Sequence, residues 1–184
     1  MVEYHRVQPD QYPGLKSNPI ITVGLADAEQ TRRLGSWIAQ RIEAGAFVGL
    51  IGALGAGKTT LMQGLVAGLD TMGGWTATSP TYSLVQVYET TPPIHHIDLY
   101  RLEGWADLES IGYWDYLEGE RGVTCVEWLD RIVGAWPGQG MIIELIRKDA
   151  SRNVRIWSDE RWAPVLKTFD AAELHGSESN EESR

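Results

Sequence analysis

The chain has 184 residues, of which 43% are hydrophobic, and 25 acidic against 16 basic residues give a net charge of −9. This length suits one domain with a sizeable core, and the acidic balance argues against a protein whose main task is to grip a nucleic-acid backbone. The single cysteine, Cys125, excludes an internal disulfide and a cysteine-built metal cage. No apolar run reaches the roughly 18 residues of a membrane span, and no signal-peptide pattern begins the chain, so we expect a soluble cytoplasmic protein without membrane contact.

The first part of the chain predicts an extension, a strand and a helix. Residues 1–19 contain several prolines and little periodicity, and we interpret them as an extension that is partly ordered at best. Residues 20–25 (IITVGL) predict a strand. Asp27 precedes apolar residues at helical spacing, with Gln30 three positions on as in a capping box, and Gly45 is expected to end that helix.

Residues 46–60, AFVGLIGALGAGKTT, carry the most informative pattern. The segment 52–59 fits G-x-x-x-x-G-K-[ST], a phosphate-binding loop. The apolar run before it predicts a buried strand, and leucines at helical spacing after it predict a helix. A dinucleotide-binding fingerprint is excluded because position 60 is Thr where a third Gly is needed. The pattern therefore predicts a binding site for a nucleoside triphosphate.

The chemistry of such a loop explains each residue type. Consecutive backbone N–H groups form an anion nest, and the following helix adds unpaired N–H groups and the positive end of its dipole. Lys58 is expected to reach the β- and γ-phosphates, and the Thr59 hydroxyl to ligate Mg²⁺. The loop residues predicted to contact the nucleotide are Leu54, Gly55, Ala56, Gly57, Lys58, Thr59 and Thr60.

Strands and short helices alternate over the rest of the chain. Strands are expected at 82–89, 94–99 and 123–128, short helical pieces around 107–111 and 113–117, and a late β-hairpin at 141–146 and 153–157. These elements predict an α/β P-loop NTPase fold with a mainly parallel, mixed central sheet flanked by helices and a late antiparallel β-hairpin. We expect this ATPase domain to span residues 20–169, between the extension 1–19 and an acidic, disordered tail 170–184.

Two acidic residues end predicted strands where open α/β sheets bind ligands. Asp98 ends IHHID and Glu127 ends VTCVE, so each is a candidate for Mg²⁺ or for orienting the attacking water, and the sequence leaves open which does which. Thr81 follows Ser-Pro in a loop between nucleotide-proximal strands. It is either a switch residue that senses the γ-phosphate or part of a plain turn.

Other reactive side chains have competing interpretations. His95 and His96 are adjacent on a strand and point to opposite faces, so they cannot chelate one ion together. His96 shares a face with Asp98 and lies either near the site or as a packed histidine behind it. Cys125 is expected to be a buried small hydrophobe. The basic residues at 147–155 are either a solvated hairpin end or a contact for phosphate or a partner.

The motifs GALGAGKTT, SPTYSLVQVY, HIDLYRL, DLESIGYWDYL and VEW occur in an order that resembles the TsaE (YjeE) family. The resemblance runs from about residue 27 to 128, with a weaker match to the hairpin near 141–157. It implies ATP and Mg²⁺ as cofactors and a slow ATPase of bacterial tRNA threonylcarbamoyladenosine biosynthesis. It also implies TsaB and TsaD as partners, which transfer the threonylcarbamoyl group to ANN-decoding tRNAs and are reset by ATP hydrolysis. The resemblance implies that tRNA is contacted only indirectly, through the partners. We expect the chain alone to be a monomer.

The resemblance also assigns residues. Lys58 and Thr59 match the family's phosphate and Mg²⁺ residues. Asp98 matches an acid at the nucleotide, Glu127 matches the acid associated with Mg²⁺, and residues 79–81 match a switch segment.

Three further positions bear on this match. Ala28 matches an adenine-side contact. Ala53 replaces an Asp that the family usually carries in the loop, so metal affinity or hydrolysis rate is expected to differ. Leu129 replaces a Pro that often follows EW, which changes a loop.

The predicted mechanism is Mg·ATP hydrolysis in which Lys58 and the loop amides stabilise the transferring phosphoryl group. Turnover is expected to be slow, because the sequence shows no obvious arginine finger and a partner is expected to complete the site. Arg101 is the only nearby candidate for that role in cis. Two alternatives remain open. A P-loop small-molecule kinase would carry a lid with several arginines, and the span after the loop has few. The second alternative is a nucleotide-gated binding module without significant hydrolysis, because Ala53 stands where the family usually carries an acid.

Overall fold

The computed structural model describes residues 6–118 and 122–175. Its strands are β1 (Ile21–Leu25), β2 (Phe47–Ile51), β3 (Val85–Tyr88), β4 (Ile94–Asp98), β5 (Val123–Glu127), β6 (Met141–Lys148) and β7 (Ser151–Ser158). Its helices are α1 (Ala28–Ala39), α2 (Lys58–Leu69), α3 (Trp105–Ser110) and α4 (Ala163–Leu166). Short 3-10 helices are η1 (Pro9–Gln11), η2 (Tyr113–Tyr116), η4 (Leu129–Arg131), η5 (Val133–Ala135) and η6 (Ala171–Leu174).

One seven-stranded sheet organises the described chain, in the order β1-β7-β6-β2-β5-β4-β3. The four central strands β6, β2, β5 and β4 run parallel to one another, β7 and β3 run antiparallel to them, and β1 pairs antiparallel with β7. The predicted mixed α/β sheet is therefore confirmed. The predicted hairpin is β6–β7, and β6 pairs directly with β2, so the hairpin lies inside the main sheet.

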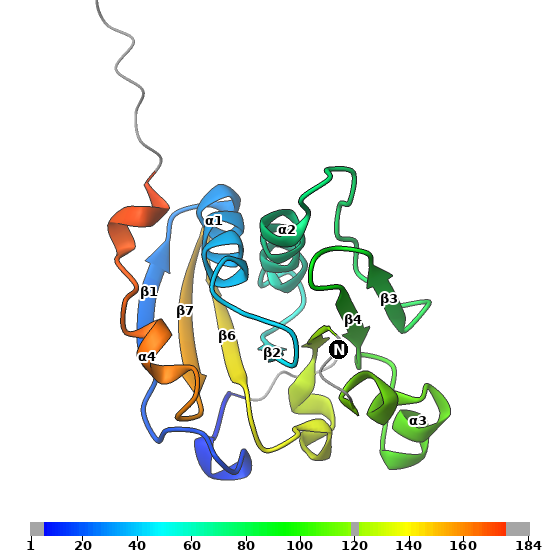
Figure 1. The fold of residues 1–184 in the computed structure, drawn as a ribbon. Helices are drawn as coiled ribbons and strands as arrows, with labels where there is room; N and C mark the ends of the chain where they lie inside the picture. Colours follow the sequence, from blue (N-terminus) through cyan, green and yellow to red (C-terminus); the bar gives the residue numbers. More distant parts are fainter. Residues whose placement is uncertain (1–5, 119–121, 176–184) are drawn as a thin grey trace, which may run out of the picture.

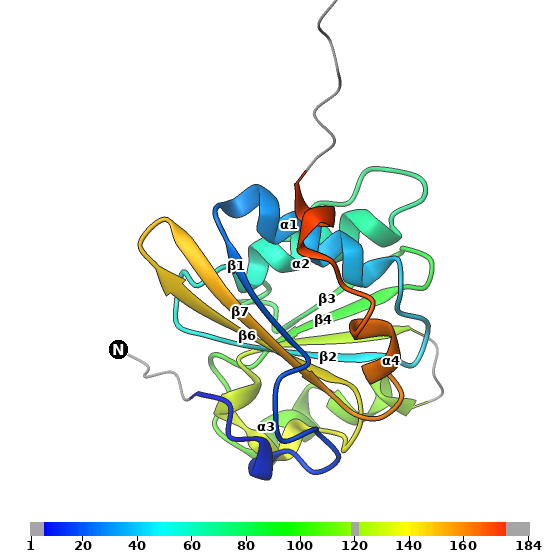
Figure 2. The ribbon, with the colours of Figure 1, turned by 90° about the vertical axis from the view of Figure 1, so that its left-hand side faces the viewer.

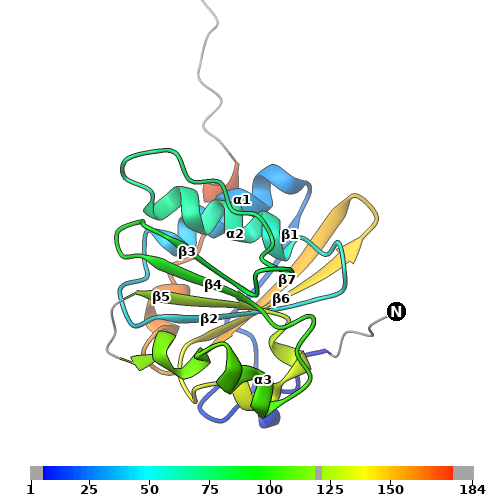
Figure 3. The same cartoon turned by 90° about the vertical axis from the view of Figure 1, so that its right-hand side faces the viewer.

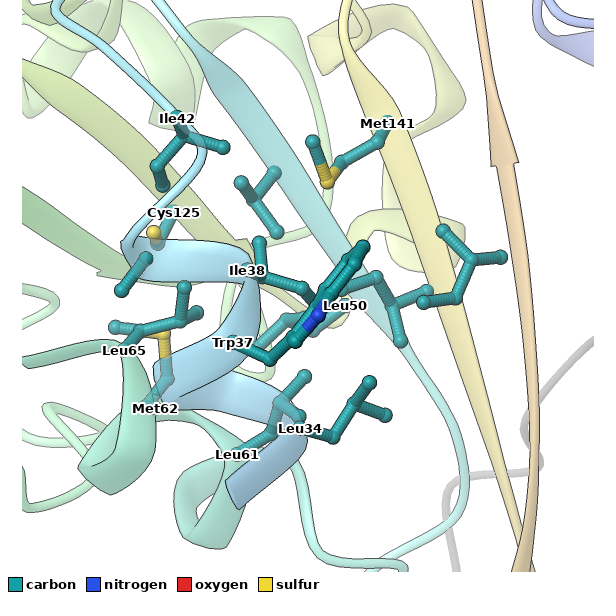
Figure 4. Packing of buried hydrophobic residues seen from close by; sticks show 14 of the residues in the cluster. Leu34, Trp37, Ile38, Ile42, Leu50, Leu61, Met62, Leu65, Cys125 and Met141 are labelled. Atoms are coloured by element: carbon teal, nitrogen blue, oxygen red, sulfur yellow. The ribbon is translucent and has the colours of Figure 1, made fainter. Parts of the chain in front are cut away.

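Two layers cover this sheet. The helices α1 and α2 lie side by side on one face, with η6 against α1, and α3 with η2, η4 and η5 lies on the other (Figures 1, 2 and 3). Figure 4 shows side chains of α1 and α2, such as Leu34 and Leu61, meeting residues of the strands, such as Leu50. A second apolar cluster on the opposite face includes Phe47 and Tyr113. The three-layer arrangement buries the central strand β2 on both faces, as its uninterrupted apolar sequence predicts.

Local signals set most of the element boundaries. Asp27 accepts a hydrogen bond from the Gln30 backbone N at 2.8 Å, and the Gln30 side chain accepts one from the Ala26 backbone N at 2.8 Å, so the predicted start of α1 is confirmed. The helix ends at Ala39, earlier than Gly45, because the chain tightens at Arg41, whose N–H bonds three residues back.

The segment before β3 also differs from the expectation. The strand predicted from residue 82 begins at Val85, because Leu84 has a positive φ of 64° and its N–H closes a turn onto the Pro80 carbonyl at 2.6 Å. Conversely, β6 and β7 are both longer than the predicted hairpin strands.

The described ends of the chain are packed against the domain. Tyr12 is buried with its ring edge against Trp136, whose indole N–H donates to the Pro13 carbonyl at 2.8 Å. Leu174 in η6 is buried, and its carbonyl accepts from Arg33 of α1 at 3.0 Å. Residues 1–5 of the predicted extension and 176–184 of the predicted tail lie outside the described residues, and the domain limits stay a prediction. No helix in the described part of the chain has the length and apolar character needed to cross a membrane.

Glycines allow α1 and α2 to lie close together. A Cβ on Gly64 would lie 2.0 Å from the Arg32 carbonyl oxygen, and one on Gly35 would lie 2.3 Å from the Leu61 carbonyl oxygen. Both distances are below any real Cβ contact and both involve backbone, so the helices could accept a side chain only by moving apart. This close packing fixes α2, and with it the loop that precedes α2.

We predict that Gly64→Ala lowers the free energy of unfolding by about 1–3 kcal/mol, because the overpacking cost exceeds the better helix propensity of alanine. Gly104→Ala is the matched control, since a Cβ there meets nothing within 4 Å. Urea denaturation of both variants measures the difference. Equal stability of the two variants would show that the helices separate without cost.

Candidate functional site

The loop that joins β2 to α2 depends on glycine at both ends. Gly52 has φ of 152°, and a Cβ there would lie 2.5 Å from the Leu145 carbonyl oxygen of β6. Gly57 has φ of 109° and is the N-cap of α2. These backbone conformations favour glycine, and they let the loop fold tightly over the end of the sheet.

A cavity of about 350 Å³ opens beside this loop and the first turn of α2. Because Lys58, Thr59 and Thr60 at the start of α2 line it, the unpaired N–H groups and positive dipole end of that helix are directed to it. Its lining residues are Leu54, Gly55, Gly57, Lys58, Thr59, Thr60, Ser79, Thr81, Tyr100, Glu127, Trp128 and Arg152.

Lys58 is buried at the cavity without a carboxylate partner among the described residues. Its ammonium donates to the carbonyl oxygens of Gly52 at 2.6 Å and Ala53 at 3.2 Å, and it lies 3.6 Å from the centre of the Trp128 ring. Burial lowers the pKa of Lys58 from 10.5 to about 8, opposed by the negative charges of Glu127 and other nearby acids. A cation held in this way is available to an anion that enters the cavity.

Glu127 connects α2 to the sheet. One of its oxygens, Oε1, accepts from the Thr59 hydroxyl at 3.0 Å and bonds His96 Nε2 at 3.1 Å. Glu127 is the register partner of Asp98 across the parallel β4–β5 pair. The two predicted acids therefore lie next to each other at the C-terminal edge of the sheet.

Asp98 is engaged differently. Its Oδ2 accepts from the hydroxyls of Ser79 at 2.9 Å and Thr81 at 2.6 Å, and its Oδ1 accepts from the Tyr100 backbone N at 2.9 Å. Asp98 is fully buried. It thus ties the predicted switch segment 79–81 to the end of β4.

An arginine reaches the loop from the hairpin. Arg152 of β7 donates from Nε to the Ala56 carbonyl oxygen at 3.2 Å and lines the cavity, with no acidic partner among the described residues. The loop after β2 runs beside the hairpin tip in Figure 3. Arg155, by contrast, forms an ion pair with buried Glu144. The residues of the basic stretch therefore differ in their contacts, and a phosphate or partner contact stays a prediction.

Most predicted site residues meet at this cavity. Ala56 and Asp98 are buried behind the lining, and Ala28 begins α1 but is not a lining residue. The lining residues that were predicted are Leu54, Gly55, Gly57, Lys58, Thr59, Thr60, Thr81 and Glu127.

The sequence interpretation missed part of the cavity wall. Arg101, expected to be the nearby arginine, does not line the cavity and lies 5.7 Å from the Tyr82 ring, whereas Arg152 does line it. Tyr100 and Trp128 each follow a strand-end acid by one or two residues. That position is a usable signal for these two aromatic residues. The sequence named Arg152 only within the basic stretch 147–155, and its place beside Ala56 could be found only from the strand order.

A family model described as "Threonylcarbamoyl adenosine biosynthesis protein TsaE" matches residues 25–155. The chain belongs to the TsaE family. This family acts in the biosynthesis of threonylcarbamoyladenosine in tRNA. The match begins at the last residue of β1 and ends within β7, so it contains the loop, both strand-end acids and Arg152.

Individual relatives agree with the family model. A "tRNA threonylcarbamoyladenosine biosynthesis protein TsaE" from Streptomyces coelicolor is 46% identical over 118 residues, covering 62% of this chain and 71% of the relative. A protein of the same name from Treponema pallidum is 35% identical over 130 residues, covering 70% of this chain and 94% of the relative.

A solved structure confirms the fold. The crystal structure of Bacillus subtilis YdiB superposes with a TM-score of 0.66 at 24% identity, covering 84% of this chain and 93% of that one.

We predict that Lys58→Met stabilises the nucleotide-free protein at pH 7 by about 1–3 kcal/mol, because it removes a buried charge that the unfolded chain keeps in water. Since the pKa of Lys58 is lowered in the folded state, the cost of this charge is full below about pH 8 and disappears by pH 10.5. The gain from Lys58→Met should therefore shrink over that interval.

Urea denaturation at pH 7, 8.5 and 10 tests this, with Lys148→Met at the exposed hairpin tip as the control. A variant less stable than wild type at pH 7 would show that the hydrogen bonds of Lys58 outweigh its desolvation.

Proposed function

We propose that the chain binds Mg·ATP in this cavity and hydrolyses it slowly to ADP and phosphate as a cytoplasmic component of tRNA threonylcarbamoyladenosine biosynthesis. The observation that carries the proposal is the Lys58 ammonium, which is buried at the start of α2 and whose hydrogen bonds to described residues go to the Gly52 and Ala53 carbonyl oxygens. Phosphate oxygens are stronger acceptors for a charged donor than these carbonyls, so a bound polyphosphate relieves the cost of burying the lysine.

Mg²⁺ fits this site when it arrives with the nucleotide. The Thr59 hydroxyl and the Glu127 carboxylate are neighbouring oxygen donors, the type that Mg²⁺ prefers. Among the described residues no group of three or more His, Cys, Asp or Glu is placed to hold a metal, so phosphate oxygens would supply the remaining ligands. When bound, the ion would neutralise charge that develops on the phosphoryl group.

The two strand-end acids take different roles in this proposal. Glu127 lies beside Thr59 and holds the metal. Asp98 has both oxygens occupied by Ser79, Thr81 and the Tyr100 backbone, so it positions the switch segment for the γ-phosphate. Thr81 lines the cavity and is the hydroxyl placed to sense that phosphate.

Slow turnover follows from the same contacts. Each strand-end carboxylate is already hydrogen-bonded by protein groups, and Ala53 stands where the family usually carries an acid. A nucleotide-gated binding module without significant hydrolysis is therefore the second candidate. In either case TsaB and TsaD are the proposed partners, with hydrolysis or nucleotide exchange resetting that pair between turnovers. Leu54 and Tyr82 are 78% and 91% exposed around the cavity and are available to a partner protein.

The first experiment measures ATP hydrolysis with Mg²⁺ by the purified chain, alone and with TsaB and TsaD, using Lys58→Ala as the blank. We expect low activity that rises with the partners. Tight ATP binding without hydrolysis in either mixture would favour the nucleotide-gated module. ADP formation that instead depends on a small metabolite would favour a kinase.

Arg152 is proposed to hold the diphosphate part of the nucleotide. It pairs in register with Leu25, three residues before the start of α1, on the β7 side of the loop. Thr81 and Asp98 lie on the β4 side. The hydrolysed phosphate belongs on the side of Thr81, so Arg152 contacts the α- or β-phosphate rather than the phosphate that leaves.

We predict that Arg152→Ala weakens ADP and ATP binding alike, by roughly tenfold or about 1.4 kcal/mol, the scale of one charge-assisted contact to phosphate. Calorimetric titration of both nucleotides measures this, with Lys148→Ala as a hairpin control of equal charge change. A loss confined to the hydrolysis rate would identify Arg152 as a group that acts on the transferring phosphate instead.

A further inference from the structure

His96 is fully buried and takes no direct part in the proposed hydrolysis. Its Nε2 lies 3.1 Å from Glu127 Oε1, the same oxygen that accepts from the Thr59 hydroxyl. Its Nδ1 has no hydrogen-bond partner among the described residues. A carboxylate oxygen only accepts, so Nε2 carries the hydrogen, and the unpartnered Nδ1 is left as a lone pair instead of a stranded donor.

The sheet fixes the position of this imidazole. His96 lies opposite Cys125 in the β4–β5 pairing, two residues before the Asp98–Glu127 pair, so its side chain is diagonal to Glu127 on the same face. The Tyr88 ring of β3 stacks on it, with centroids 6.1 Å apart and an interplanar angle of 30°. The Tyr88 hydroxyl in turn contacts the Thr78 backbone beside the switch segment.

We propose that His96 is a positioning residue that orients Glu127 for the metal, an inference that rests on the proposed Mg·nucleotide site. His96 donates from the sheet and Thr59 donates from α2, and both donate to Oε1. The two donors restrain rotation of the carboxylate and engage one oxygen, so that in this proposal Oε2 is left for the metal. Groups that hold a metal ligand in this way commonly contribute 10–100-fold to metal affinity.

The neighbouring position on the same strand, β4, provides a matched control. His95 is adjacent in sequence but points to the opposite face, where it is half-buried and its ring lies 5.1 Å from that of Tyr116. His95→Phe removes an imidazole from the same strand without touching Glu127. His96→Phe keeps an aromatic ring against Tyr88 and removes the donor, while His96→Gln keeps a nitrogen donor at about the reach of Nε2.

The experiment titrates the full-length chain with ADP, once in EDTA and once in excess Mg²⁺, and compares the ratio of the two dissociation constants among variants. We expect wild type, His95→Phe and His96→Gln to share one ratio. We expect His96→Phe to reduce the strengthening by Mg²⁺ about tenfold, with its Mg²⁺-free affinity within about twofold of wild type. ADP is used because it does not turn over, so the readout is independent of activity.

Each outcome decides the inference. An unchanged ratio in His96→Phe, or an equal loss in His96→Gln, would overturn the role of the donor while leaving the nucleotide site intact. No effect of Mg²⁺ on wild type would overturn the metal part of the proposed function and this inference with it. Circular dichroism checks folding, and His96→Met, which is smaller and flexible, replaces His96→Phe if that variant does not fold.

Discussion

The cavity depends on one lysine ammonium that burial has separated from water and that forms no ion pair within the described part of the chain. Lys58 is held by carbonyl oxygens and an indole ring, and its lowered pKa records the cost of that placement. The close packing of α1 on α2 through Gly64 keeps the helix, and therefore the lysine, from relaxing outward. The core thus holds in place a charge whose burial costs stability, and on the proposed function a bound phosphate would offset that cost.

The parallel register places two carboxylates side by side, and each has its own hydrogen-bond partners. Asp98 and Glu127 are paired across β4 and β5, yet hydroxyls of the switch segment occupy Asp98, and Thr59 with His96 occupies Glu127. The two acids therefore hold equivalent positions in the sheet but have different hydrogen-bond partners. Those partners give Asp98 the proposed role of anchoring the switch segment and Glu127 the proposed role of metal ligand.

Much of this arrangement could be predicted because it depends on the spacing of residues that are close in the sequence. The loop, its flanking strand and helix, and the two strand-end acids each follow from a few consecutive residues. Arg152 could not be assigned, because its place beside Ala56 requires knowing that β6 pairs with β2 and β7 follows. The early end of α1 and the late start of β3 were missed for a different reason, since local turns there override a favourable periodicity.

Protein contacts also connect the proposed switch segment to Glu127, the proposed metal ligand. Thr78 meets the Tyr88 hydroxyl, Tyr88 stacks on His96, and His96 holds Glu127. On the proposed function, a partner that moved residues 78–81 would disturb Asp98 directly and Glu127 through these two rings. Both acids would then respond to one displacement, which is what a partner-controlled site needs if it is to remain slow until it is engaged.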